Sequence, residues 1–166
     1  MTTEELLERY AAGERNFAGL CLSSPKVLED VDLRGINLSG ADLNSIHIYR
    51  SNLSEARLSR ASMVSSTLID INLSNADLNC ACLYRADWRN VNLSEAYLWG
   101  ANLTKAALRN ANLFFTNLEG AILVQTSLRG ATNTESVFRT HDALIWNLRL
   151  PDGSIDEGPR FEFLEY

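Results

Sequence analysis

A large apolar residue occupies every fifth position from Leu33 to Leu128, and this spacing constrains the fold more than any other feature of the chain. Of these 20 positions, which we call the leucine column, 17 are leucine and the others are Ile48, Met63 and Trp88. On an α-helix, with about 3.6 residues per turn, side chains five apart would spread around every face. On a β-strand they would alternate between two faces. Only a chain that bends once per five residues can direct all of them into one core.

A second column lies two residues before the first, and it holds eleven alanines, five valines or isoleucines, and Ser51, Ser66, Thr116 and Thr126. Its small residues fit the narrow space beside the leucines. Glycines fall two residues after the leucine column, where a corner needs unusual backbone angles. Together these patterns predict an all-β solenoid with short strand-like sides, whose coils stack about 4.8 Å apart through ladder hydrogen bonds.

Many five-residue units read Ala-(Asp/Asn)-Leu-X-X, among them residues 41–45, 76–80, 101–105 and 111–115. These units resemble the pentapeptide repeat family, and the resemblance covers residues 31–130 without a gap. It implies a right-handed quadrilateral β-helix with four units per coil. The core is then expected to contain Leu33, Leu38, Leu43, Leu53, Leu58, Leu73, Leu78, Trp88, Leu103 and Leu128.

Both ends of such a coil need a cap, because open coils expose unpaired backbone groups. We expect an N-terminal capping helix, the β-helix and a C-terminal cap at residues 1–16, 17–140 and 141–166. Thr2 and Glu5 form a capping-box pattern, which predicts a short helix at about residues 3–12. The repeat phase continues upstream, across a one-residue insertion near Pro25, to Leu28, Leu22 and Phe17. An end coil left open would offer a surface for homodimerisation.

The phase fades downstream, where Asn133 stands in place of a leucine although Phe138 keeps the spacing. This favours an irregular exit from the coil. Beyond it, the strand-like segments Leu144–Leu150 and Phe161–Phe163 flank a turn signal that begins at Pro151. The tail is therefore expected to form a hairpin or an irregular, strand-like cap. Similar Pro-Asp-Gly tails follow the repeats in cyanobacterial members of the family, so the resemblance points to that source.

The negative charge of the chain is concentrated at its ends. The formal net charge is −6, but residues 31–130 hold eight acids and nine bases, a net charge of +1. Three cysteines, an odd number, suit a reducing compartment, and Cys80 and Cys82 lack zinc-site spacing, so we expect free surface thiols. The sequence has no signal-peptide pattern and no apolar run of membrane length. We therefore expect a cytoplasmic protein without membrane association.

Few groups in the sequence are suited to catalysis. Its two histidines, His47 and His141, have no nucleophile motif around them. The Asp and Asn residues that precede the leucine column are expected to satisfy corner backbone groups rather than to bind a metal. If coils hold 20 residues, stacked amides form a ladder at Asn52, Asn72, Asn92 and Asn112. We expect no enzymatic activity, no cofactor and no metal.

A second ladder is expected from Arg89, Arg109 and Arg129, each one residue after the leucine column. Like charges at strand spacing repel one another, which lowers stability unless another charge intervenes. The sequence allows two interpretations. In the first, solvent together with Asp70 and Asp87 relieves the repulsion between the arginines. In the second, an acidic or phosphate-bearing partner relieves it.

Large aromatic residues are predicted on the outside of the coil, at Tyr84, Tyr97, Trp99, Phe114 and Phe115. Contiguous exposed aromatics often mark an interface, although these five do not all share one side. They form a surface for an acidic protein partner, with Arg109 at its border, or a bed on which residues 144–166 dock. The sequence leaves both interpretations open.

These patterns favour a non-enzymatic protein–protein interaction module, whose partner the sequence does not identify. The alternative implied by the resemblance is an inhibitor or protector of DNA gyrase, because some family members imitate a DNA duplex and protect gyrase from quinolones. Mimicry of DNA needs a strongly negative coil surface, and the net charge of +1 over residues 31–130 argues against it. Binding of nucleic acid is not expected either, because a chain of net charge −6 lacks a broad basic face.

Overall fold

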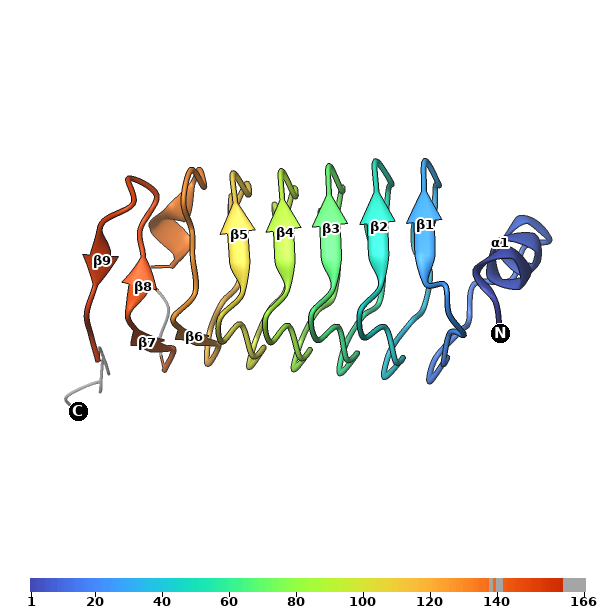
Figure 1. Ribbon diagram of the computed structural model, residues 1–166, viewed down its shortest axis with the longest axis horizontal. Helices are drawn as coiled ribbons and strands as arrows, with labels where there is room; N and C mark the ends of the chain where they lie inside the picture. The colour runs from blue at the N-terminus through green and yellow to red at the C-terminus, as the bar shows by residue number, and fades with distance from the viewer. Residues whose placement is uncertain (138, 140–141, 160–166) are drawn as a thin grey trace.

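The computed structural model describes residues 1–137, 139 and 142–159, and its coils stack into one elongated solenoid (Figure 1). The helix α1 (Thr3–Ala11) lies at one end of the stack. The strands are β1 (Val27–Glu29), β2 (His47–Tyr49), β3 (Thr67–Ile69), β4 (Asp87–Arg89), β5 (Ala107–Arg109), β6 (Ile122–Val124), β7 (Leu144–Trp146), β8 (Leu148–Arg149) and β9 (Ile155–Asp156). They are only two or three residues long, because the chain turns a corner after every five residues.

The pairing register shows that each central coil contains 20 residues. Strands β1 to β5 form a parallel sheet in which Leu28 pairs with Ile48, and Ile48 pairs with Leu68. Bridges with the same offset occur on the other sides of the coil, as between Asn52 and Asn72. Four five-residue units therefore complete one coil. The predicted right-handed quadrilateral β-helix is confirmed.

We number the four sides of the coil by the leucine-column residues at their centres. In the middle of the stack, side 1 is centred on Leu93, side 2 on Leu98, side 3 on Leu103 and side 4 on Leu108. Each side also contains the column residues 20 positions earlier and later. Side 4 carries β1 to β5, and side 2 lies opposite to it across the core.

The leucine column forms the core of the protein. All 20 of its residues are at most 2% exposed, and the ten singled out from the sequence are among them. The residues of the second column are buried as well, except Val31, which is half-buried. The solenoid thus contains one continuous hydrophobic core along its whole length.

The four polar residues of the second column are buried, and each makes a hydrogen bond inside the coil. The Ser66 hydroxyl accepts a bond from the indole nitrogen of Trp88 at 3.1 Å. The other three hydroxyls donate to backbone carbonyls: Ser51 to Tyr49, Thr116 to Leu93 and Thr126 to Leu103. Burial of these hydroxyls without a hydrogen bond would carry a desolvation cost. Each of the four polar residues in the second column therefore has a hydrogen-bond partner.

The corners of the coil use the left-handed backbone region throughout. At all 20 positions two residues after the leucine column, φ lies between 44° and 72°, and fifteen of these residues are not glycine. The residue before the column stabilises the turn, as where Asn72 accepts a hydrogen bond from the backbone N–H of Ser74 at 3.1 Å. This confirms that the recurring Asp and Asn side chains satisfy backbone groups at the corners.

Side 1 carries the predicted asparagine ladder. The side-chain amide of Asn72 donates to the amide oxygen of Asn52 at 3.2 Å, and that of Asn92 donates to Asn72 at the same distance. The ladder begins at Asp32 and continues through Asn112 to Asn133. Asn133, which replaces a leucine in the column, is therefore the last amide of this ladder.

Substitution of Asn72 by alanine is expected to lower the free energy of unfolding by about 1–3 kcal/mol, because three hydrogen bonds lose a partner. Denaturant melts followed by circular dichroism measure this loss. The matched control is Ser94→Ala, whose hydroxyl makes no side-chain hydrogen bond with the described residues, and its effect should stay within roughly 0.5 kcal/mol. Equal losses for the two variants would contradict a stabilising role of the ladder.

The N-terminal cap is a helix, as predicted. The Thr2 hydroxyl accepts a bond from the backbone N–H of Glu5, and the Glu5 carboxylate accepts one from the backbone N–H of Thr2. The side chain of Leu6 is completely buried against the first coil. The Tyr10 hydroxyl donates to the backbone carbonyl of Arg34 at 2.7 Å. Helix α1 thus covers apolar surface that the first coil would otherwise expose.

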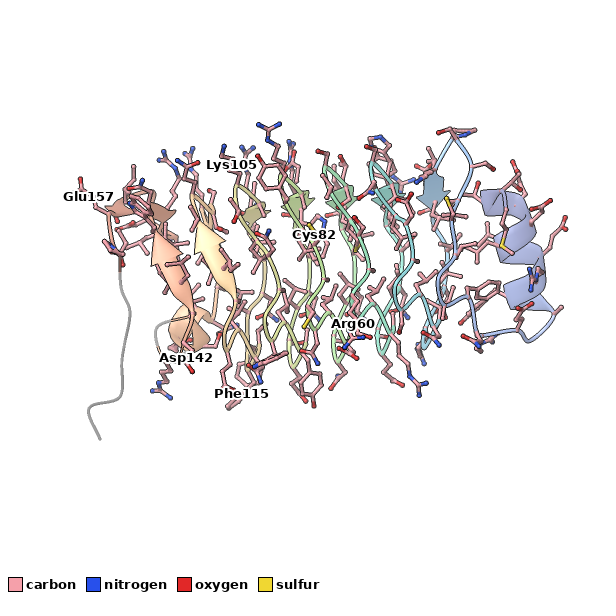
Figure 2. All side chains as sticks on the ribbon, turned by 90° about the horizontal axis from the view of Figure 1, so that it is seen from below. Arg60, Cys82, Lys105, Phe115, Asp142 and Glu157 are labelled. Atoms are coloured by element: carbon pink, nitrogen blue, oxygen red, sulfur yellow. The ribbon has the colours of Figure 1, made fainter. Side chains whose placement is uncertain are left out.

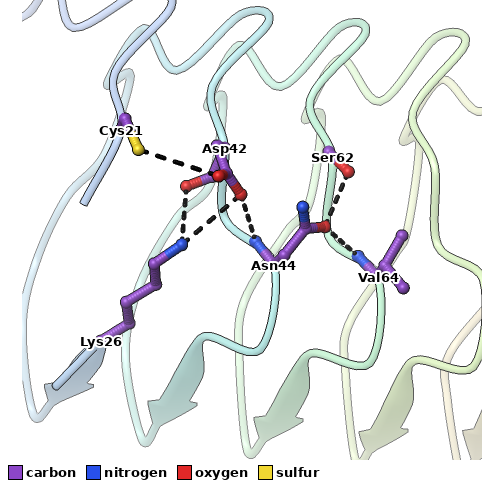
Figure 3. A network of polar contacts seen from close by, with 6 residues as sticks. All are labelled: Cys21, Lys26, Asp42, Asn44, Ser62 and Val64. Atoms are coloured by element: carbon purple, nitrogen blue, oxygen red, sulfur yellow. Dashed lines mark hydrogen bonds and ion pairs between the residues drawn. The ribbon is translucent and has the colours of Figure 1, made fainter. Parts of the chain in front are cut away.

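The one-residue insertion predicted near Pro25 is present. Cys21 pairs with Asp42, an offset of 21 residues, whereas β1 pairs with β2 at an offset of 20. Polar contacts gather at this point on side 3 (Figure 3). The Lys26 ammonium lies 3.5 Å from the Asp42 carboxylate. The pKa of Asp42 lies below its usual range, because the backbone N–H of Asn44 donates to the carboxylate and Lys26 is close.

The C-terminal end leaves the regular coil after Asn133. That residue is left-handed, with φ of 55°, and a short 3₁₀ helix, Thr134–Ser136, follows it. The solenoid then resumes, because β7 pairs with β6 at an offset of 22 residues. Thus β7, in the segment expected to be a cap, belongs to a further coil. Strands β8 and β9 form the hairpin around Pro151. Phe138, His141 and Phe161–Phe163 lie outside the described residues.

Candidate functional site

Four large aromatic side chains are exposed on side 2 or at its corner in two neighbouring coils. Tyr97 and Trp99 flank the buried Leu98 on side 2 and are 51% and 52% exposed. Phe114 and Phe115 occupy the corner between sides 1 and 2 in the next coil, 45% and 75% exposed. Their rings meet edge to face with centroids 4.5 Å apart. We call Tyr97, Trp99, Phe114 and Phe115 the aromatic surface.

A hollow of about 440 Å³ adjoins this surface. It is lined by Phe114, Phe115, Thr116, Asn117, Leu118, Glu119, Asn133, Glu135, Ser136 and Arg139. It lies where the coil is interrupted, because the 3₁₀ helix follows Asn133 in place of another regular unit. This hollow was not predicted from the sequence, where Asn133 in place of a leucine is its available signal.

The structure does not bring the other two members of the expected surface to this place. Tyr84 is half-buried on side 3, with the Arg85 guanidinium 5.1 Å from its ring centre. Arg109 lies in β5 on side 4, opposite Trp99. The expectation that Arg109 borders the aromatics was wrong, because ten residues correspond to half a coil. Figure 2 shows the same separation between Phe115, at one edge, and Lys105, at the other.

Acidic residues outnumber basic ones beside the aromatic surface, because the hollow is lined by Glu119, Glu135 and Arg139, and Glu95 lies nearby. The backbone N–H of Glu95 bonds to the carbonyl of Phe114 at 2.8 Å, which places Glu95 at the adjacent corner. Glu119 follows Trp99 by one coil, and its carbonyl accepts a bond from Gly100 at 2.9 Å. The sequence predicted an acidic partner at this surface, with Arg109 at its border. The excess of acidic residues beside the aromatics disfavours such a partner.

The described part of the tail does not cover the aromatics. Strand β7 pairs with β6 on side 3, and β8 bridges to Ser127 on side 4, so residues 144–156 follow the coil away from side 2. The four aromatic side chains stay at least 45% exposed in the presence of these residues. The docking-bed interpretation therefore fails for this part, and residues 160–166 lie outside the described range.

The arginine ladder is present on side 4. Arg89 pairs with Arg109 between β4 and β5, and Arg129 follows in the next coil. Asp87 relieves part of the repulsion through an ion pair with Arg89 at 2.6 Å. The hydrogen bond from Arg89 holds the pKa of the Asp87 carboxyl below its usual range, and Arg109 adds to this effect. Asp70 instead accepts a bond from Asn90 at 2.8 Å.

Within residues 1–137, 139 and 142–159, no group of three or more His, Cys, Asp or Glu side chains is arranged to hold a metal. His47 lies beside Tyr49, 3.5 Å from its hydroxyl. Cys21, Cys80 and Cys82 are free thiols, and Cys82 is half-buried. In the same part of the chain, no helix has the length and apolar character needed to cross a membrane.

The sequence model described as pentapeptide repeats matches residues 27–63, 51–90 and 92–130, with eight copies. This chain belongs to the pentapeptide repeat family. Its coils contain four five-residue units, with leucine inside and a left-handed corner residue. Pentapeptide repeat proteins are generally non-catalytic structural or interaction proteins. Among curated proteins, none matches the sequence significantly.

Several solved pentapeptide repeat structures are similar to this one. Rfr23 from the cyanobacterium Cyanothece 51142 has a TM-score of 0.66 and 27% identity, covering 78% of this chain and 96% of that chain. A pentapeptide repeat protein from the thylakoid lumen of Arabidopsis thaliana has a TM-score of 0.61 and 26% identity, covering 75% and 83%. QnrB1, a plasmid-mediated fluoroquinolone resistance protein, has a TM-score of 0.52 and 20% identity, covering 81% and 67%. At that identity the likeness to QnrB1 concerns the fold alone.

Proposed function

We propose that this protein is a rigid, non-enzymatic module that binds a partner protein through the aromatic surface. The observation that carries the proposal is the exposure of Tyr97, Trp99, Phe114 and Phe115, all at least 45%, on side 2 and its corner in two neighbouring coils. Phe114 and Phe115 also line the hollow. Large aromatic side chains at interfaces contribute much of the binding energy when a partner excludes water from them. None of the four belongs to the buried core, so folding alone does not account for their exposure.

The backbone under this surface is held rigidly. Phe114 donates its backbone N–H to the Asn112 amide at 3.2 Å and accepts a bond from Glu95. Trp99 donates its backbone N–H to the Asn79 side chain at 2.9 Å. A preorganised surface loses little conformational entropy on binding, so more of the contact energy appears as affinity.

The surroundings indicate the chemistry of the partner. The hollow of about 440 Å³ can admit an apolar side chain beside Phe114 and Phe115. Glu95 and Glu119 lie next to the aromatics, which favours a partner with basic residues around an apolar anchor. This replaces the acidic partner expected from the sequence.

Interference with DNA gyrase is the alternative function. The fold similarity to QnrB1 is consistent with it, but residues 31–130 carry a net charge of +1, which does not suit a mimic of DNA. In a supercoiling assay the purified protein is expected to cause no inhibition. Inhibition at low micromolar concentration would favour the alternative.

The double substitution Trp99→Ala with Phe114→Ser is expected to abolish partner capture while leaving the melting curve nearly unchanged, because neither side chain belongs to the core. Capture uses a photo-crosslinking phenylalanine analogue in place of Phe115, in cells that naturally contain the protein, and mass spectrometry identifies the product.

The matched control is Trp146→Ala, which removes an indole that is 50% exposed on β7. The crosslinked product should persist in this control and disappear in the double variant. Equal yields in both variants would contradict the proposal. A double variant that fails to fold would show that the aromatics are structural.

A further inference from the structure

The basic residues between positions 80 and 130 gather on one side of the coil. Residues 80–130 contain five Lys and Arg residues, and all of them lie on side 4 or at the corner leading to it: Arg85, Arg89, Lys105, Arg109 and Arg129. Of the three acids in this range, only Asp87 shares that side. A local basic surface is therefore present although the net charge over residues 31–130 is only +1.

The three arginines form one row across neighbouring coils. Arg89 and Arg109 are paired residues of β4 and β5, and the carbonyl of Arg129 accepts a bond from Asn110 at 3.0 Å. Neighbouring coils lie about 4.8 Å apart, so the outer arginines are roughly 10 Å apart along the axis. Like charges held at this spacing destabilise the folded protein unless an anion binds between them.

Most of this positive charge has no internal partner. Asp87 forms an ion pair with Arg89. Among the described residues, no hydrogen bond or ion pair satisfies the side-chain nitrogens of Lys105, Arg109 or Arg129. The Arg85 guanidinium lies over the Tyr84 ring and forms no ion pair with the described residues. A binding partner that carries carboxylates would supply what the fold does not.

Acidic residues limit the basic surface at both ends. On the same side, towards the N-terminus, Asp70 lies at the corner and Glu29 and Asp30 bind Arg50. Beyond Arg129, β8 carries one more arginine, Arg149, and Asp156 lies in β9, which pairs with β8. A long polyanion along this side would meet these carboxylates, and tight binding of nucleic acid takes many phosphate contacts. The surface suits a short anionic ligand.

We propose that the basic row of Arg89, Arg109 and Arg129, with Lys105 at the other corner of the same side, binds an acidic α-helical segment of a partner protein. Along a helix with a rise of 1.5 Å per residue, carboxylates at positions i, i+3 and i+7 stand about 4.5 and 10.5 Å from the first. The row offers guanidinium groups at about 4.8 and 10 Å, so each can meet one carboxylate. This surface lies opposite the aromatic surface and rests on observations independent of the proposed function.

The test uses the full chain and fluorescein-labelled peptides of about 18 residues, long enough for an alanine-based helix to form. One peptide carries glutamates at i, i+3 and i+7 on one face, and a second has the same composition with the glutamates on three different faces. A third probe is a thymidine oligonucleotide of about 12 nucleotides. Anisotropy titrations at low salt should show the tightest binding for the one-faced peptide. Equal binding of both peptides, tighter binding of the oligonucleotide, or no binding would overturn the proposal.

The variant Arg109→Gln with Arg129→Gln should weaken binding of the one-faced peptide about tenfold, because two charge pairs are lost. The matched control, Arg57→Gln with Arg60→Gln, removes the same charge from side 2 and should change binding less than about twofold. Thermal melts should show no loss of stability in the Arg109 and Arg129 variant, since it relieves repulsion. Equal weakening by both double variants would show that net charge, and not the row, governs binding.

Discussion

Replacement of Trp88 with alanine is expected to lower the free energy of unfolding by about 3–5 kcal/mol. Trp88 is completely buried and is the largest side chain in the leucine column. It lies between Leu68 and Leu108, which hold the same position in the neighbouring coils. Because those coils are fixed by hydrogen bonds on all four sides, they cannot collapse into the cavity left by the indole.

The loss also includes a polar term. The indole N–H donates to Ser66, whose hydroxyl is fully buried and would lose its partner. Trp88→Phe keeps most of the apolar volume and removes the donor, and it should cost about 1–3 kcal/mol. Combining Trp88→Phe with Ser66→Ala should cost less than the sum of the two single substitutions, because neither polar group is then left alone.

Denaturant melts followed by circular dichroism measure these values. Trp146→Ala is the control, since that indole is 50% exposed, and its effect should be below roughly 1 kcal/mol. A loss for Trp88→Ala no larger than that of the control would be incompatible with a central buried position for Trp88.

Leu103→Ala is expected to cost about 2–5 kcal/mol, while Lys105→Ala should stay within roughly 0.5 kcal/mol. The two residues are only two positions apart, but Leu103 is fully buried at the centre of side 3 and Lys105 is exposed at the following corner. The carbonyl of Leu103 also accepts the Thr126 hydroxyl at 2.7 Å, which ties two coils together at this point.

The measurement is again a pair of denaturant melts, with the slope of the transition compared between variants. In a solenoid each coil is stabilised mainly by its neighbours, so a cavity in mid-stack weakens both interfaces of one coil. If the leucine variant instead melts in two steps, the coils unfold separately on either side of residue 103. Similar losses of stability for Leu103→Ala and Lys105→Ala would mean that the side chain of Leu103 does not point into the core.

The fold could be predicted from sequence because one physical requirement repeats 20 times. Leucines at every fifth position can all point inward only if the chain bends once per five residues. The insertion near Pro25 was visible as one step of six residues before Leu28. The C-terminal end was harder to predict. Asn133 ends a polar ladder where a leucine was expected, and the two extra residues before Leu144 fall in a stretch without a repeat signal.

The surfaces were predicted less well than the core. The five-residue spacing shows that a side chain points outward, but not on which of the four sides of the coil it lies. Trp99 and Arg109 are both outward and near in sequence, yet ten residues place them on opposite sides. The buried partner of Trp88 was missed for a related reason. Ser66 precedes it by 22 residues, a separation that is meaningful only once the coil length is known.

The coil length also determines how this molecule tolerates changes in chain length. Insertion of 20 residues adds one coil and leaves every downstream side chain on its original side, only about 4.8 Å further along the axis. A five-residue insertion keeps every leucine inward but rotates all downstream surfaces by a quarter turn. A length that is not a multiple of five shifts the leucine spacing and moves polar residues towards the core, unless the extra residues bulge out locally, as the one-residue insertion near Pro25 does. Gain or loss of single pentapeptides can therefore reorient the aromatic surface relative to the N-terminal half in right-angle steps, while the core remains intact.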